Sequence, residues 1–139
     1  MVILDTDVLS ALMLNEPDTI VASWLDRQAR ASVWTTSVTI FEIRYGLEIM
    51  PSGRRRAALY AGLSRLLEEK LEGRVAVFDE TAAEAAAKLM GRRQLAGRPR
   101  ELRDTMIAGI ALAQRATLAT RNIRHFGDVD VPVVDPWQA

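Results

Sequence analysis

The sequence contains no cysteine and only one histidine. Without cysteine the chain can form neither a disulfide framework nor a thiolate metal site, and one histidine cannot supply the nitrogen ligands typical of zinc. A metal ion held by this chain would therefore have oxygen ligands, which favours magnesium, manganese or calcium. The same absences leave no cysteine nucleophile and no set of histidines for catalysis.

A long hydrophobic run is also missing from the sequence. No apolar segment approaches the roughly 18–20 residues that are needed to cross a bilayer. The N-terminus has neither the basic region nor the small-residue cleavage site of a secretory signal. We therefore expect a cytoplasmic protein that does not enter a membrane.

Charge of one sign is not in excess, because 18 acidic residues balance 18 basic ones. No overall positive field therefore indicates a nucleic-acid partner. The basic residues are nonetheless unusual, since all except Lys70 and Lys88 are arginines, whose forked guanidinium suits phosphate oxygens. They cluster at residues 54–56, 92–93 and 98–103. From composition alone, these clusters fit either phosphate contacts or solvated helix faces.

Short apolar runs alternate along the chain with longer segments of helical spacing. The expected strands cover residues 2–4, 32–36, 74–78, 117–120 and 131–134. The expected helices cover residues 19–30, 37–50, 54–72, 80–96 and 103–115. Strands separated by helices predict an α/β fold in which a parallel sheet of four to five strands lies between two helical layers. The length suits one core, so we expect one domain over residues 1–139.

In an open α/β sheet, ligands bind beyond the carboxyl ends of the strands, where the strand order reverses. The polar residues directly after the expected strands are therefore the candidates for a functional site. They are Asp5 and Asp7, Ser37 leading to Glu42, Asp79, and the run Thr120-Arg121-Asn122.

Two acidic positions lie where helices begin. Asp5 follows the first strand, and Asp104 sits in the first turn of the most apolar helical segment. Either residue could be a helix cap, because aspartate accepts hydrogen bonds from the free N–H groups there. Acidic side chains at both Asp5 and Asp7 are more than capping needs, so these positions also remain candidates for a charged site.

Glu42 is expected to face inward. Its helical neighbours at spacings of three, four and seven residues are Val38, Tyr45, Gly46 and Ile49. Burial of an unpaired glutamate would cost several kcal/mol. The residue therefore needs a partner, either an arginine at the edge of the core or a bound cation.

Asp5, Glu42 and Asp104 are expected to converge in this fold. Carboxylates that converge repel one another unless they are protonated or bind a hard cation. Magnesium or manganese would relieve the repulsion and would also stabilise charge on a phosphoryl group. The residues themselves therefore predict an oxygen-ligated metal site with phosphoester chemistry.

Five segments occur in a characteristic order, namely VILDTDVLSAL, TSVTIFEIRYGL, RDTMIAGIALA, LATRNIRHF and VVDPW. Together they resemble the ordered motifs of PIN-domain ribonucleases, and especially the VapC and FitB toxins of bacterial toxin–antitoxin pairs. The resemblance spans essentially the whole chain. It implies a PIN-like α/β/α fold and a magnesium- or manganese-dependent endoribonuclease. It also implies a homodimer that a VapB-like antitoxin inhibits by covering the cleft with its C-terminal segment.

The resemblance assigns roles to individual positions. Asp5 and Asp104 would be metal ligands, and Glu42 would complete the acidic cluster and orient the metal or a water molecule. Thr120 and Asn122 would line the fourth corner of the site. The arginines expected to contact RNA phosphates are Arg121 foremost, then Arg98 and Arg100.

Two positions depart from the usual family pattern. The first motif is usually Asp-Thr-Asn, whereas here the third residue is Asp7, which we expect to support Asp5 by accepting hydrogen bonds from backbone amides of the following turn. The fourth acidic position of many PIN nucleases is Asn122 here. A second tightly bound metal is then not expected, unless Asp128 or Asp130 substitutes for the missing carboxylate.

Two other functions fit parts of the sequence. The opening VILDTDV also matches haloacid-dehalogenase-like phosphatases, in which Asp5 would be a covalent nucleophile and Asp7 a general acid. That hypothesis leaves Glu42 and Asp104 unexplained, and the chain is short for a capped phosphatase. The second alternative is a catalytically inactive PIN-like binding module, which Asn122 favours.

Overall fold

Five parallel strands form a sheet in the order β3-β2-β1-β4-β5 in the computed structural model, which describes all 139 residues. The strands are β1 (Val2–Leu4), β2 (Val33–Thr36), β3 (Val75–Ala76), β4 (Thr117–Ala119) and β5 (Val133–Val134). Every neighbouring pair is parallel. The predicted α/β fold with a parallel sheet is therefore confirmed, although the third strand is shorter than the expected 74–78.

Six α-helices connect the strands. They are α1 (Thr6–Leu12), α2 (Thr19–Asp26), α3 (Ser37–Glu48), α4 (Arg54–Arg65), α5 (Glu80–Leu95) and α6 (Leu102–Gln114). The helix expected over 54–72 ends at Arg65 and continues as a π-helical turn, Leu66–Lys70, while the one expected over 19–30 ends at Asp26. Short 3-10 turns cover Arg30–Ser32 and Ile123–Phe126. None of these helices is long and apolar enough to span a membrane.

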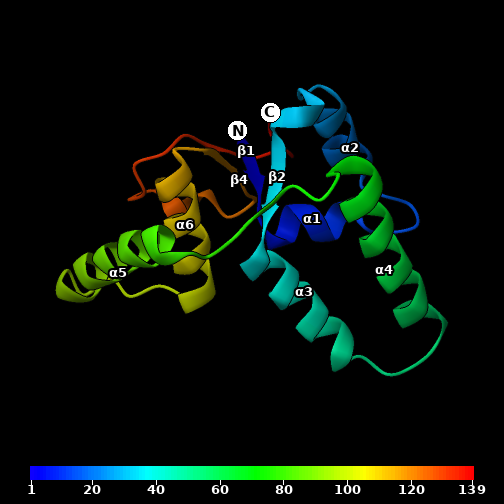
Figure 1. The fold of residues 1–139 in the computed structure, drawn as a ribbon, viewed down its shortest axis with the longest axis horizontal. Coiled ribbons are helices and arrows are strands. Elements are labelled where there is room, and N and C mark those ends of the chain that lie inside the picture. Colours follow the sequence, from blue (N-terminus) through cyan, green and yellow to red (C-terminus); the bar gives the residue numbers. More distant parts are fainter.

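Two hydrophobic clusters cover the two faces of the sheet. Consecutive residues of β1 point to opposite faces, so Leu4 joins the cluster under α1, α2 and α4, whereas Ile3 joins the cluster under α5 and α6. Figure 1 shows these two helical groups on opposite sides of the strands. Helices α5 and α6 approach closely at Gly109, where an added Cβ would lie 2.6 Å from both the Ala82 carbonyl oxygen and the Ala86 Cβ.

The strand order reverses next to β1. The chain first builds β2 and β3 on one side of β1, and it later adds β4 and β5 on the other side. Leu4 and Ala119, the last residues of β1 and β4, are paired in register. The residues that follow, Asp5 and Thr120, therefore lie at the switch point, which is where such sheets bind ligands.

Candidate active site

Asp5 is the most buried carboxylate of the chain, with 5% of its surface exposed. It caps α1 by accepting a 3.1 Å hydrogen bond from the backbone N–H of Val8. Burial raises the pKa of Asp5 to about 7, even though hydrogen bonds from Thr120 and Val8 oppose the shift. The charges of Asp7 and Asp104 raise that pKa further. Asp5 is thus both a helix cap and a desolvated carboxylate that a proton or a cation would stabilise.

Asp104 lies in the first turn of α6, as predicted, but it is not the cap of that helix. The cap is Glu101, whose carboxylate accepts a 3.0 Å hydrogen bond from the Asp104 backbone N–H. The Asp104 carboxylate instead lies 3.2 Å from Nδ1 of His125. Burial raises the pKa of Asp104, and the contact with His125 lowers it. Capping is therefore not the reason for an aspartate at this position.

Glu42 is half-buried, but not on the face that the sequence predicted. The expected inward stripe holds for Val38, which is buried, but is wrong for Tyr45, which is 52% exposed, and for Ile49, which is 68% exposed. The other buried residues of α3 are Thr39, Ile43 and Leu47. Glu42 lies at the edge of this buried face. Its partial burial follows from how α3 packs on the sheet, and the spacing of apolar residues in the sequence did not predict that orientation.

Glu42 has two polar partners. Its Oε1 accepts a 2.8 Å hydrogen bond from the Thr6 hydroxyl, and its Oε2 lies 3.7 Å from Nε of Arg103. Burial raises the pKa of Glu42, while the Thr6 hydrogen bond and the charge of Arg103 lower it. The arginine partner considered from the sequence is therefore present, and burial of Glu42 does not by itself require a cation.

Asn122 forms hydrogen bonds both with Thr120, at the end of β4, and with Asp7 of α1. Its backbone N–H donates a 3.0 Å hydrogen bond to the hydroxyl of the buried Thr120. Its side-chain Nδ2 donates a 2.7 Å hydrogen bond to Oδ2 of Asp7. The expectation that Asp7 would bond backbone amides of the following turn is wrong, because Asp5 takes the Val8 amide and Asp7 bonds Asn122.

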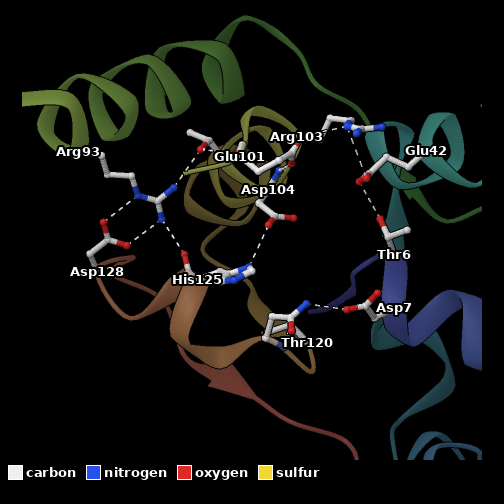
Figure 2. A network of polar contacts seen from close by, with 12 residues as sticks. Thr6, Asp7, Glu42, Arg93, Glu101, Arg103, Asp104, Thr120, His125 and Asp128 are labelled. Carbon is white, nitrogen blue, oxygen red and sulfur yellow. Dashed lines mark hydrogen bonds and ion pairs between the residues drawn. The ribbon is translucent and has the colours of Figure 1, made fainter. Parts of the chain in front are cut away.

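Figure 2 shows that the carboxylates of Asp7, Glu42 and Asp104 face one shared space, with Thr120 at its edge. These side chains come from α1, α3, α6 and the end of β4, so residues from four separate elements meet there. No three Asp, Glu or His side chains are close enough together to form a complete ligand set for a metal ion. Magnesium usually keeps several waters and takes only one or two carboxylates, so Asp5 and Asp104 still fit such an ion.

His125 and Arg93 are among the residues near the site that the sequence did not indicate. His125 contacts Asp104, and Arg93 of α5, with only 3% of its surface exposed, binds the segment that carries His125. The Arg93 guanidinium donates hydrogen bonds to the His125 carbonyl oxygen at 2.9 Å and to Thr105 at 3.0 Å (Figure 2). The spacing of Arg93 from the buried residues Ala86 and Leu89 on one helical face was a signal that could have identified it.

Arg93 also binds the carboxylate of Asp128. Two 2.8 Å hydrogen bonds join its Nε and Nη2 to the two carboxylate oxygens of Asp128. The Asp128 carboxylate is therefore engaged, and the suggestion that it replaces a fourth site carboxylate is wrong. Asp130 is exposed and has no side-chain hydrogen bond or ion pair to the site.

The arginines expected at the phosphates are exposed. The Arg121 guanidinium carbon lies 4.5 Å from the centroid of the Trp137 ring. Arg98 and Arg100 lie in the segment between α5 and α6, and no side-chain hydrogen bond or ion pair connects them with the carboxylates. Arg103, which was not predicted, is the arginine that contacts Glu42.

Comparison with known proteins gives a consistent result. The family model of the PIN domain matches residues 2–132. The chain is 37% identical over 139 residues to "Plasmid stability protein StbB" of Pseudomonas syringae pv. tomato, and the match covers all of both chains. It is 34% identical over 138 residues to "VapC ribonuclease Y4jK" of Sinorhizobium fredii and 30% identical over 137 residues to "Toxin FitB" of Neisseria gonorrhoeae. Each of these two matches covers 99% of both chains.

A solved structure supports the same grouping. The chain is similar to one in "Structure of FitAB bound to IR36 DNA fragment", with a TM-score of 0.86 and 29% sequence identity. The match covers 99% of this chain and 96% of the other.

Proposed function

Because the chain belongs to the PIN-domain family, and within it to the toxins of the VapC/FitB type, we propose that it is a metal-dependent endoribonuclease that hydrolyses RNA phosphodiester bonds. The observation that carries this proposal is the buried Asp5 carboxylate, which has Asp7 and Asp104 as charged neighbours and lies where the strand order reverses. In a bacterium such an enzyme would act on RNA in the cytoplasm, as one domain over residues 1–139.

Asp5 and Asp104 would hold a magnesium or manganese ion. When bound, this ion would stabilise the negative charge that develops on the phosphoryl group in the transition state. The Val8 backbone N–H holds the Asp5 carboxylate by a hydrogen bond, and the Thr120 hydroxyl accepts one from the Asn122 backbone N–H. Glu42, fixed by Thr6 and Arg103, would orient the attacking water.

The proposed substrate contacts lie around these residues. Arg121 follows the buried Thr120 directly, so its exposed guanidinium is close to the end of β4 and available to an RNA phosphate. Arg98 and Arg100 precede α6, which begins beside the site, and they would extend the same positive edge.

A cognate VapB-like antitoxin is the proposed protein partner, in a toxin–antitoxin hetero-oligomer built on a toxin homodimer. An exposed apolar groove is lined by Phe41 and Tyr45 of α3, by Phe78, and by Leu102 and Met106 of α6. The Phe41 and Tyr45 rings stack with centroids 6.3 Å apart, and both are more than half exposed. Exposed apolar surface of this kind is typical of protein–protein contacts.

RNA cleavage by the purified chain, freed of any antitoxin, tests the proposal. We expect cleavage with magnesium or manganese and none with EDTA, and we expect the Asp5→Ala variant to be inactive. If that variant cut as well as the wild type, the activity would belong to a contaminating nuclease. A folded protein that binds no manganese and cuts no RNA would instead be an inactive binding module.

The phosphatase alternative has lost its support. The PIN-domain match covers both Asp5 and Asp7, which were the two residues on which that hypothesis depended. It also covers Glu42 and Asp104, which the phosphatase hypothesis left unexplained.

A further inference from the structure

The hydrogen bond between Asn122 and Asp7 joins an amide to a carboxylate across the site. The two residues are 115 positions apart, and their bond of 2.7 Å has the length of a charge-assisted contact. We propose that Asp7 adds negative charge beside the cation site of Asp5 and Asp104, in the space that the Asp104 carboxylate also faces, and that Asn122 positions it there (Figure 2). This inference rests on the proposed function, because it concerns the same cation.

Asp7, like Asp5, has no positively charged side chain as a partner. Glu42 forms an ion pair with Arg103, and Asp104 contacts His125, whereas Asp7 has only the neutral amide of Asn122. Its charge therefore stays uncompensated within the protein. The Asp7 carboxylate faces the same space as that of Asp104 (Figure 2), so a cation in that space would be attracted by its charge.

The orientation of Asn122 follows from its two hydrogen bonds. A carboxylate can only accept, so the NH2 group of the amide must face Asp7. The backbone N–H of Asn122 donates to the hydroxyl of Thr120, which directly follows β4. Two hydrogen bonds therefore connect the end of β4, through Asn122, to Asp7 and hold the Asp7 carboxylate in place.

The pair has the reverse arrangement of the one that the sequence resemblance implies, in which residue 7 is an asparagine and residue 122 is an acid. One amide and one carboxylate form the same hydrogen bond whichever side carries the charge. The exchange therefore keeps both the contact and the number of charges. A single substitution changes the number of charges. Asp7→Asn leaves two amides, which can still hydrogen-bond but carry no charge, and Asn122→Asp places two carboxylates against each other.

Manganese titration by calorimetry tests this exchange in the wild type, in both single variants and in the double variant Asp7→Asn/Asn122→Asp. Both positions are exposed, so each variant should fold. We expect Asp7→Asn to weaken manganese binding by roughly tenfold to a hundredfold, the range typical for groups that support a metal site. The double variant should regain most of that affinity. Asn122→Asp alone should lower the melting temperature of the metal-free protein.

Asp130→Asn is the matched control, because it removes one exposed negative charge that has no contact with the site. Its manganese affinity should stay within twofold of the wild type. An Asp7→Asn variant that binds manganese as tightly as this control would overturn the inference, and so would a double variant no better than Asp7→Asn. If either result is obtained while the wild type still cleaves RNA in a manganese-dependent way, the inference about Asp7 fails but the proposed function stands. A wild type that binds no manganese would end both.

Discussion

The hydroxyl of Thr6 donates a 2.8 Å hydrogen bond to Oε1 of Glu42, which lies 36 residues further along the chain. Thr6 follows Asp5 directly, so one short segment provides both the buried carboxylate at the end of β1 and the group that holds a second carboxylate on α3. The contact therefore couples the positions of Asp5 and Glu42.

Replacing Thr6 by valine keeps the size of the side chain but removes the donor. Glu42 then loses a hydrogen bond in a half-buried place, which should lower the free energy of unfolding by about 1–2 kcal/mol. RNA cleavage should fall as well, because Glu42 is no longer held. Thermal melts and cleavage assays measure both effects, and Thr6→Ser is the control that restores the hydroxyl. Full activity of Thr6→Val would show that Glu42 needs no such support.

Asp104→Asn keeps the shape of the side chain and removes one charge. Because Glu101 caps α6, the substitution does not disturb the cap. We expect the metal-free protein to become more stable, since Asp104 is half-buried beside other carboxylates. Cleavage and most of the response to manganese should be lost. In the wild type, manganese at about a hundred times its Kd should add roughly 2.7 kcal/mol to the free energy of unfolding. An active Asp104→Asn enzyme with an unchanged metal response would contradict the proposed site.

The stability of the metal-free protein should depend on pH through Asp5. Its pKa is raised to about 7, so the folded state binds a proton more tightly than the unfolded state does. This contribution is present at low pH and is lost as pH rises from about 4 to about 7. Other carboxylates with lowered pKa, such as Asp18 and Asp128, act in the opposite direction. The measurement is therefore the difference in unfolding free energy between the wild type and Asp5→Asn. Because asparagine does not titrate, the wild type should lose a few kcal/mol of stability relative to this variant over that range. A constant difference would refute the prediction.

Arg121→Ala separates a phosphate contact from a packing role. If Arg121 binds a phosphate of single-stranded RNA, its loss should lower the slope of log affinity against log salt by roughly 0.7. The guanidinium also lies over Trp137, so its loss should cost about 0.5–1 kcal/mol of stability as well. RNA binding at several salt concentrations, with Arg115→Ala as a control on the surface beyond α6, makes the comparison. A lower melting temperature with an unchanged salt slope would assign Arg121 to packing alone.

Much of the fold could be predicted, because short apolar runs and helical spacing are local properties of the chain. The range of the helix Thr6–Leu12 was not predicted, although Asp5 was considered as a helix cap, since seven residues give too short a pattern to recognise. The orientation of α3 was wrong for a related reason. Exposed Phe41 and Ile49 are as apolar as the buried Ile43 and Leu47, so hydrophobicity alone does not distinguish the two faces.

By itself, the sequence determined the chemistry that this protein has available. With no cysteine and one histidine, a metal site has to be built mainly from oxygen ligands, and the order of five segments indicated the family. The tertiary structure alone decided which side chains become partners. Asn122 and Asp7 form a hydrogen bond although they are 115 residues apart in the sequence. Arg93 and Asp128, which bind each other, are 35 residues apart, and His125 and Asp104 are 21 residues apart. Such pairings depend on strand register and on how the helices pack, because a side chain finds its partner in space and no local pattern encodes that distance.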